Sequence, residues 1–517
     1  MKNLTILLGI LATMLFACKK VSNSGSILVI NQDSLVALSE AGYRPVYHFT
    51  PPQHWMNDPN GLVYYQGKYH LFYQYNPNSN VWGPMNWGHA TSTDLFNWQD
   101  NAIALSPDNA GAIFSGSAVV DVNNTTGFKA SANDPLVAVY TIAGTQQQQG
   151  IAYSTDGGIS WAKYANNPVL PNGGMADFRD PKVFWSALAG KWVMALATGN
   201  KISFYSSANL KNWVLESSFG ENEGAHGGVW ECPDIFELPV DGSATKKWVL
   251  LVSCNGGPNG GTATQYFVGS FDGKTFTTET HNTMWVDYGT DNYAGVTYND
   301  LPNTDGRRIT IGWMSNWAYA QQVPTTTWRS TMTVPRTFSL SNTAQGYVLK
   351  SMPVVEINNY LSSINDTAVS TPVKSLRIDN NAVIKTGSYE IDFTADLNAT
   401  SNLQLTLGNS SEKLVISYDK AAGQLMVNRG SSGLVDFNNQ FAHPIICPFI
   451  PPTGGITDFK ILVDKTSVEL FADNGTRVVT ALFFPIYQYN FLKLAGDGTS
   501  AVINSFTLKS INKSIAR

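Results

Sequence analysis

Short runs of alternating apolar and polar residues, separated by Gly, Asn, Asp and Pro, fill most of residues 43–345. Such runs predict β-strands joined by turns. Residues 62–65 and 69–75 are one example, because they flank Gly67 and predict a β-hairpin. We therefore expect an all-β domain in this part of the chain.

A repeat divides this region. A polar turn followed by an aromatic residue recurs, and the closing aromatics Trp98, Trp161, Trp213 and Phe276 follow one another at intervals of 63, 52 and 63 residues. A repeated all-β unit of this size is typical of propeller blades. Four such units, with the remaining strand at 308–313, allow five blades.

The pattern changes after residue 347, where aromatic residues become less frequent. We interpret 346–371 as a linker. Residues 372–512 contain strands of clean alternation, such as 389–393 and 460–464. One solvent-exposed and one buried face per strand predicts an antiparallel β-sandwich.

The first 18 residues combine a basic start, a short apolar run and small residues before Cys18. This pattern predicts a secretory signal peptide, because the apolar run is too short to span a membrane. The last four residues resemble the bacterial lipoprotein cleavage box, in which the cysteine is lipidated. An ordinary signal peptide with a chance cysteine is the alternative. We predict an exported bacterial lipoprotein, anchored to the cell envelope by Cys18 and followed by a tether at 19–42.

Composition narrows the function classes. The 517 residues are 43% hydrophobic and 12% aromatic, enough for two packed domains. The net charge of −5 becomes −6 when Lys2 leaves with the signal peptide, and no basic run is present, which argues against nucleic-acid binding. Cys232, Cys254 and Cys447 are scattered, without the spacing of a disulfide framework or a metal site. We expect no metal and no cofactor, and the oligomeric state is open.

One short stretch carries the strongest chemical signal, W-M-N-D-P-N-G at 55–61. Asp58 precedes a proline and is biased toward extended backbone, while Asn60 and Gly61 can supply the positive φ of a tight turn. We therefore place Asp58 at the mouth of a sheet. A surface aspartate that only starts a turn is the alternative. Many aromatic residues surround this stretch, as would suit a pocket for the apolar face of a sugar.

Two further acidic motifs follow, R-D-P at 179–181 and E-C-P-D at 231–234. Asp180 lies beside Arg179, whose charge would keep it ionised. Glu231 has apolar neighbours, as suits a proton donor. In each case a purely structural pairing with an arginine is the alternative.

Together these motifs resemble the glycoside hydrolase family of invertases, inulinases and levanases, family 32, in which they occur in the same order. The resemblance implies a five-bladed propeller followed by a β-sandwich. It also implies a retaining mechanism, with Asp58 as nucleophile and Glu231 as general acid/base. Asp180 would hold fructose hydroxyls as C2 becomes cationic.

The same resemblance implies substrate contacts by further residues, which match the family by motif or spacing: Asn57, Gln74, Trp82, Phe114, Ser115, Arg179, Tyr293 and Trp313. Asn292 departs from the phenylalanine usual before Tyr293, which puts the contact by Tyr293 in doubt. Ordinary packing within the blades is the alternative for Trp82, Phe114 and Trp313.

These residues predict an exo-acting enzyme that releases fructose from fructans such as levan and inulin, and also from sucrose. An aromatic wall of Trp55, Trp82, Phe114 and Trp313 would close a pocket around one ring. A fructan-binding protein without catalysis and a fructosyltransferase of the same fold are the alternatives. The sandwich is expected to be structural, with subsite contacts or dimerisation as secondary roles. Linkage preference is left open.

Overall fold

The structure, a computed structural model, describes residues 35–344, 346–498 and 500–512. This part is almost entirely β, with one α-helix, α1 (Ala382–Thr386), and two 3-10 helices, η1 (Glu40–Tyr43) and η2 (Val355–Tyr360). Among the described residues, no helix has the length and apolar character needed to cross a membrane. The predicted signal peptide, Cys18 and most of the tether lie outside the described residues.

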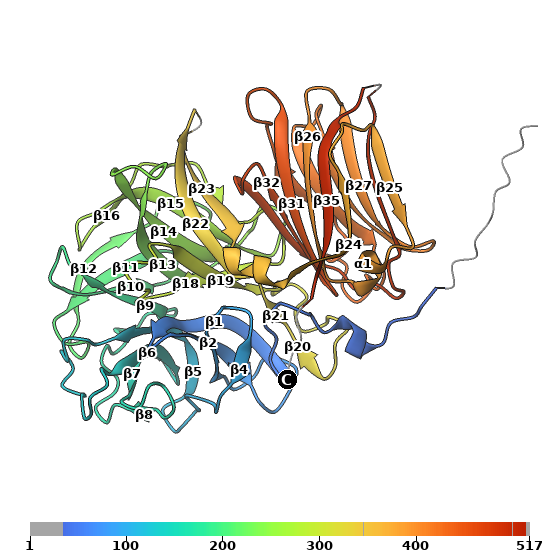
Figure 1. Cartoon of the computed structure of the whole chain (residues 1–517). Helices are drawn as coiled ribbons and strands as arrows, with labels where there is room; N and C mark the ends of the chain where they lie inside the picture. The colour runs from blue at the N-terminus through green and yellow to red at the C-terminus, as the bar shows by residue number, and fades with distance from the viewer. Residues whose placement is uncertain (1–34, 345, 499, 513–517) are drawn as a thin grey trace, which may run out of the picture. The chain divides into compact units, whose positions relative to one another are not determined.

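Five antiparallel sheets form the blades of a propeller, in chain order (Figure 1). Blade 1 contains β1 (His54–Tyr65), β2 (Lys68–Asn76), β3 (Asn86–Ser92) and β4 (Trp98–Asp100), with β20 (Trp328–Arg329) parallel to β1. Blade 2 contains β5 (Ala112–Val120), β6 (Leu136–Ala143), β7 (Gln147–Ser154) and β8 (Ala162–Lys163). Blade 3 contains β9 (Arg179–Ser186), β10 (Lys191–Ala197), β11 (Ile202–Ser207) and β12 (Val214–Phe219).

Blades 4 and 5 each carry one additional short strand. Blade 4 contains β13 (Trp230–Pro239), β14 (Lys246–Asn255), β15 (Thr262–Phe271) and β16 (Phe276–Thr278), and β17 (Met284–Trp285) also pairs with β15. Blade 5 contains β18 (Tyr293–Thr297), β19 (Arg308–Met314), β22 (Arg336–Thr343) and β23 (Gly346–Pro353), and β21 (Thr331–Met332) pairs with β19. The five predicted blades are confirmed.

The aromatic repeat marks the outermost strands of blades 1 to 4. Trp98 and Phe276 begin β4 and β16, while Trp161 and Trp213 directly precede β8 and β12. Before each aromatic, an Asp or Asn side chain accepts backbone N–H groups two to four residues further on, and these turn residues are Asp94, Asp156, Asn209 and Asp272. Such side-chain turns fix the entry to each outer strand, which explains why the pattern recurs.

The innermost strands, β1, β5, β9, β13 and β18, contact one another in a closed ring. Hydrogen bonds cross between blades along this ring. Ser117 on β5 accepts from the Val183 N–H at 2.9 Å, and the buried Lys182 donates to the Thr297 carbonyl at 2.7 Å. The first bond joins the neighbouring strands β5 and β9, and the second joins β9 to β18 across the ring.

The second domain is a sandwich of two six-stranded antiparallel sheets (Figure 1). One sheet has the order β24 (Leu361–Val369), β35 (Ile503–Ile511), β26 (Tyr389–Asp396), β31 (Ile456–Asp464), β32 (Ser467–Ala472) and β33 (Arg477–Leu482). The other has the order β25 (Ser375–Asp379), β34 (Phe491–Gly496), β27 (Asn402–Gly408), β28 (Lys413–Asp419), β29 (Gln424–Ser431) and β30 (Ile445–Pro448). Their inward residues, such as Phe393, Leu405 and Ile461, form one apolar core.

Two expected boundaries differ from the structure. The predicted linker at 346–371 contains two strands, since β23 pairs with β22 in blade 5 and β24 pairs with β35 in the sandwich. The described end of the predicted tether is also held in place, because the Leu38 N–H donates to the Ile486 carbonyl at 2.9 Å. β24 and the end of the tether have partners distant in sequence, which local patterning does not reveal, whereas β23 forms a local hairpin with β22.

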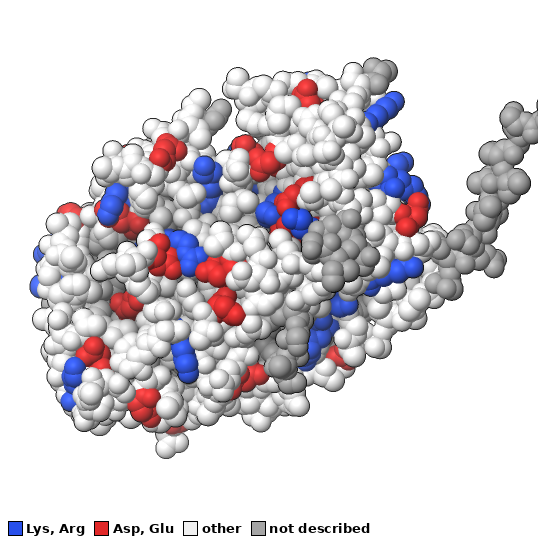
Figure 2. Space-filling model, in the orientation of Figure 1, with Lys and Arg blue, Asp and Glu red and all other residues white. Residues whose placement is uncertain are grey.

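Charge is sparse on the surface. Only 14% of residues are charged, and on the face drawn in Figure 2 both signs are interspersed among uncharged residues. Several charged side chains are instead buried between propeller and sandwich, where they pair with one another: His48, Asp291, Arg336, Arg429, Asp464 and Glu469. These buried ion pairs therefore hold the two domains together.

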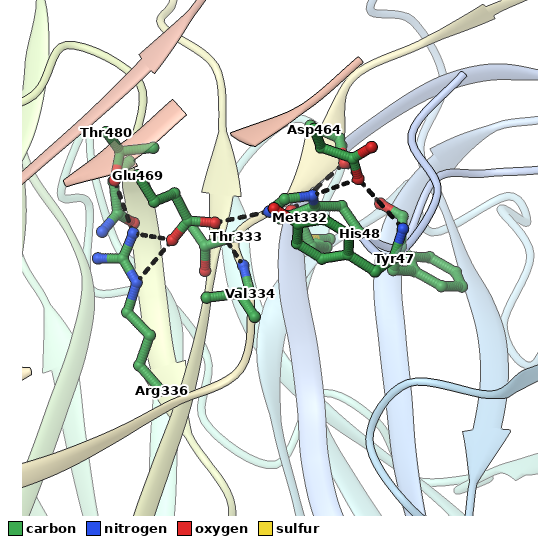
Figure 3. A network of polar contacts seen from close by, with 12 residues as sticks. Tyr47, His48, Met332, Thr333, Val334, Arg336, Asp464, Glu469 and Thr480 are labelled. Carbon is green, nitrogen blue, oxygen red and sulfur yellow. Dashed lines mark hydrogen bonds and ion pairs between the residues drawn. The ribbon is translucent and has the colours of Figure 1, made fainter. Parts of the chain in front are cut away.

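His48 is the centre of one such buried network (Figure 3). Its Nδ1 lies 2.9 Å from Asp464 and its Nε2 lies 2.6 Å from Glu469. Since each ring nitrogen faces a carboxylate, both carry a proton and the ring is an imidazolium. Burial lowers the pKa of His48, but the two carboxylates outweigh burial and raise it to about 9. Burial also raises the pKa of Glu469, but Arg336 and His48 bring it down to about 2.

Candidate active site

All five inner strands break register at the same level. Each gains one residue relative to its neighbour, at 56–59, 113–116, 179–182, 231–234 and 293–296. Such β-bulges redirect side chains and are frequent beside active sites. The residues at these breaks include Asp58, Ser115, Asp180, Glu231 and Tyr293. The breaks therefore bring residues from all five blades to one end of the ring.

Asp58 lies inside a strand and not beyond its end. Residues 54–65 form the continuous strand β1, and Gly61 (φ 54°) lies at a second break within it, between Asn60 and Val63. The predicted tight turn at Asn60 and Gly61 is therefore wrong. The pairing of β1 with β2 therefore shifts register twice. Pro59 has no N–H to donate to β2, and at position 61 only glycine fits against the ring of Phe72.

The carboxylate of Asp58 is half-buried and well supplied with donors. Ser115 Oγ donates to it at 2.6 Å and Asn57 Nδ2 at 3.1 Å. Asn57 is itself fixed by the indole N–H of Trp55 at 2.8 Å. Burial raises the pKa of Asp58, the hydrogen bond from Ser115 lowers it, and the charge of Glu231 raises it further. The donors therefore orient a carboxylate whose pKa burial and Glu231 raise above its ordinary value.

Asp180 has the backbone strain typical of a functional position, with φ at 64°. Its Oδ2 accepts the Cys232 N–H at 3.0 Å. Burial raises the pKa of Asp180, Arg179 opposes this, and the charges of Glu231 and Asp58 add to it. Arg179 therefore does not bring the pKa of Asp180 below its ordinary value, because burial and two neighbouring carboxylates outweigh one guanidinium that lies 3.9 Å away.

Glu231 forms a closer ion pair with the Arg179 guanidinium than Asp180 does. Arg179 donates to its Oε1 from Nε at 3.1 Å and from Nη2 at 3.0 Å. On the other oxygen, Oε2, the hydroxyl of Tyr293 donates at 2.5 Å. Burial raises the pKa of Tyr293 well above its usual range, so this hydroxyl stays a donor. Glu231 thus pairs with an arginine, and this pair lies within the group of carboxylates.

Cys232 connects these groups and was not predicted as a site residue. Its Sγ lies 3.6 Å from Asp58 Oδ2 and 3.6 Å from Asp180 Oδ2. Burial and the three carboxylates raise the pKa of this thiol well above its usual range, so it is a neutral donor. The structure therefore brings Asp58, Asp180 and Glu231 together around a single buried cysteine. The E-C-P-D motif that contains Cys232 was the available signal.

Two partners of Arg179 were also missed. Asp177 Oδ1 accepts from its Nη1 at 2.5 Å, and Gln147 accepts from the same nitrogen at 3.3 Å. Gln147 belongs to the neighbouring blade and sits in a run of four glutamines, so nothing in the local sequence distinguished it.

The predicted aromatic wall divides into two kinds of residue. Trp82 is 44% exposed and packs edge-on against the half-buried Phe114, with ring centroids 6.1 Å apart. Trp55 and Trp313 are completely buried and pack with Tyr293 and Cys232 in one apolar cluster. Trp313 has no exposed surface and packs edge-on against Tyr293, with ring centroids 6.5 Å apart, while its Nε1 has no hydrogen-bond partner among the described residues. Its predicted contact with substrate stays a prediction.

Gln74 lies on β2 and is buried. Its Nε2 has no hydrogen-bond partner among the described residues, which leaves a donor for a bound group.

A cavity between the five inner strands is lined by residues from every blade, including Asn60, Ser115, Asp180, Cys232 and Thr297. Across the described ranges, no group of three or more His, Cys, Asp or Glu side chains is arranged to hold a metal ion.

This combination defines a class of protein. A ring of five blades that gathers three carboxylates beside accessible aromatic rings, followed by a β-sandwich, is the architecture of a glycoside hydrolase. The family model "Glycosyl hydrolases family 32 N-terminal domain" matches residues 48–353, and "Glycosyl hydrolases family 32 C terminal" matches 356–510. The chain belongs to glycoside hydrolase family 32.

Named relatives cover nearly the whole chain. A levanase of Bacillus subtilis (strain 168) is 45% identical over 91% of this chain and 71% of its own length. An extracellular exo-inulinase of Aspergillus niger is 41% identical over 88% of this chain and 92% of its own. Among solved structures, the exo-inulinase from Aspergillus awamori has a TM-score of 0.84 and 36% identity, over 94% of this chain and 100% of that one. The beta-fructofuranosidase from Schwanniomyces occidentalis complexed with fructosyl-erythritol has a TM-score of 0.84 and 33% identity, covering 92% and 99%.

Proposed function

We propose that this enzyme is an exo-acting β-fructosidase. It releases terminal β-D-fructofuranosyl residues from fructans such as levan and inulin, and from sucrose, with retention of configuration. The observation that carries this proposal is the meeting of Asp58, Asp180 and Glu231 around Cys232, with two groups that orient Glu231. The relatives named levanase and exo-inulinase support fructans as the substrate class.

In the first step, the Asp58 carboxylate attacks C2 of the terminal fructosyl unit. Glu231 donates its proton to the glycosidic oxygen as the bond from that oxygen to C2 breaks. Ser115 and Asn57 hold the nucleophile in position through their hydrogen bonds. The products are a fructosyl ester on Asp58 and the shortened chain.

In the second step, water attacks C2 while Glu231 accepts a proton from it. The bond between C2 and Asp58 breaks, which frees fructose and restores both carboxyl groups. Asp180 supports the oxocarbenium-like states of both steps by hydrogen bonds to fructose hydroxyls that strengthen as C2 gains positive charge.

The accessible aromatic residues support exo action. Trp82 and Phe114 place their rings edge to face on the first two blades, next to Ser115. Aromatic surfaces of this kind pack against the apolar face of one sugar ring. A site built on one ring favours the chain end over an internal unit.

The location is part of the same proposal. Residues 1–18 would direct export, and lipid on Cys18 would anchor the enzyme to the cell envelope. Bacterial relatives named levanase suit degradation of an external polymer. Labelling of cells with a radioactive fatty acid tests the anchor, since a Cys18→Ser variant would then carry no label.

Chromatography of the first products from levan and inulin tests the activity. Free fructose as the only early product from either polymer is the expected result. A ladder of oligosaccharides would contradict exo action. An Asp58→Ala variant purified in parallel controls for contaminating hydrolases, because it should release no fructose.

A further inference from the structure

A short segment, 286–292, connects β17 to β18 and lies against strand β33 of the sandwich. The Tyr288 N–H donates to a carbonyl of β33 at 2.8 Å, and the Asp291 N–H donates to the Thr480 carbonyl at 3.3 Å. Gly289 approaches Thr480 so closely that a Cβ there would collide with the Thr480 backbone. The segment is therefore docked on the sandwich backbone to backbone.

Two buried carboxylates of this segment point into the sandwich. Asp287 accepts the Thr480 N–H at 2.9 Å and its hydroxyl at 2.5 Å. Asp291 accepts the Leu482 N–H at 3.0 Å and Arg429 Nη1 at 2.7 Å. Both side chains of the Asp291–Arg429 ion pair are completely buried. A buried, directional pair of this kind fixes position as well as holding the domains together.

The same segment leads directly to the acid/base group. Tyr293 is the second residue after Asp291, and its hydroxyl donates to Glu231 Oε2 at 2.5 Å. Between them, Asn292 Nδ2 donates back to Asp287 at 3.2 Å, which ties the segment to itself. A displacement of Asp291 would therefore move Tyr293, because only Asn292 separates them and its hydrogen bond to Asp287 restrains it.

We propose that the sandwich positions Glu231 for proton transfer, through Arg429 and Asp291 as positioning residues and Tyr293 as the group in contact. This inference rests on the proposed function, because it concerns the proton that Glu231 delivers to the glycosidic oxygen. It assigns the sandwich a part in catalysis beyond covering an apolar face of the propeller.

A substrate whose leaving group needs no proton separates this role from simple support of the fold. Fluoride departs from C2 of β-D-fructofuranosyl fluoride without general-acid help, whereas the glucose of sucrose needs a proton from Glu231. The value of kcat/KM reports the first step in both cases. A fault in the positioning of Glu231 therefore lowers kcat/KM for sucrose far more than for the fluoride.

The experiment compares Asp291→Asn, Gly289→Ala and Tyr293→Phe with the wild type on both substrates. Each variant should lose about tenfold in kcat/KM for sucrose and less than about twofold for the fluoride. In the Tyr293→Phe background, Asp291→Asn should add little further loss for sucrose, because both act through one contact. Gly289→Ala repeats the test without changing charge, should Asp291→Asn fail to fold.

Tyr360→Phe is the matched control. It removes a hydrogen bond to Asp94 at 2.7 Å, between η2 and blade 1, away from the segment. It should leave both kcat/KM values unchanged. Equal losses on sucrose and the fluoride for Asp291→Asn and Gly289→Ala would overturn the proposal. A wild type that releases fructose from neither substrate would instead refute the proposed function.

Discussion

The five inner strands of the propeller differ in regularity from the sandwich strands β31, β32 and β33. All five inner strands carry an extra residue at the same level. In the sandwich, β31, β32 and β33 pair without any shift of register. The irregular strands hold the carboxylates, and the regular strands form the surface on which the propeller docks.

The difference shows where backbone strain is useful. Asp180 and Cys232 both have positive φ, which costs on the order of 1 kcal/mol or more for each non-glycine residue. Hydrogen bonds between blades, such as that from Lys182 to Thr297, hold the strained residues in place. The strain turns the side chain of Asp180 and the N–H of Cys232 toward each other.

The largest expected effect comes from replacing the nucleophile, which lies on the irregular inner strand β1. Asp58→Asn should lower the rate of fructose release by at least about 10⁴-fold, because the amide cannot attack C2. The melting temperature should change little, as the side chain keeps its shape. Asp392→Asn, at an ion pair of the sandwich with Lys460, is the control and should change activity less than about twofold. Activity of Asp58→Asn near that of the control would refute the assignment.

The next effect concerns the docking surface. His48→Gln removes the imidazolium between Asp464 and Glu469 and should lower the free energy of unfolding by about 3 kcal/mol at pH 6. The folded pKa of His48, about 9, lies above the unfolded value of 6.5, so its contribution is complete below pH 6.5. In the wild type that contribution is lost as pH rises from 6.5 to 9.

Urea unfolding at several pH values measures this effect. The wild type should lose stability between pH 6.5 and 9, while His48→Gln should show a flatter dependence over the same range. Parallel curves for the two proteins would contradict a buried imidazolium.

A smaller effect is expected at the second blade. Ser115→Ala removes the 2.6 Å hydrogen bond to Asp58 and should lower kcat/KM for sucrose by about tenfold. The same loss is expected with β-D-fructofuranosyl fluoride, because the nucleophile serves both substrates. A loss confined to sucrose would show that Ser115 acts on the leaving group instead.

The smallest effect is on pH dependence. The hydrogen bond from Ser115 lowers the pKa of Asp58, so Ser115→Ala should raise it. Asp58 must be ionised to attack, and the acid limb of kcat/KM for β-D-fructofuranosyl fluoride should therefore move to higher pH, by less than about one unit. A limb that moves to lower pH would show that Ser115 does not stabilise the ionised carboxylate.

Much of this architecture was predictable because it repeats or alternates. Asp or Asn turns before Trp98, Trp161 and Trp213 are local, and they indicated the blades. Asp58, Asp180 and Glu231 lie in short sequence motifs, so the sequence alone identified all three carboxylates. Cleanly alternating strands after residue 372 indicated the sandwich.

The rest depends on partners distant in sequence. Arg179 was expected beside Asp180 but donates to Glu231, 52 residues away. Trp313 was expected on the surface of the pocket but is buried, since burial depends on how blade 5 packs. Register breaks also escape a sequence pattern, because an extra residue in one strand is defined only against its neighbour.

Trapping of the covalent intermediate tests the central claim most directly. Glu231→Gln, which lacks the base for the second step, should accumulate fructosyl-enzyme when mixed with β-D-fructofuranosyl fluoride. After acid quenching and proteolysis, mass spectrometry should find one added fructosyl group on the peptide that contains Asp58. An adduct on another peptide, or turnover with no adduct at all, would contradict the account.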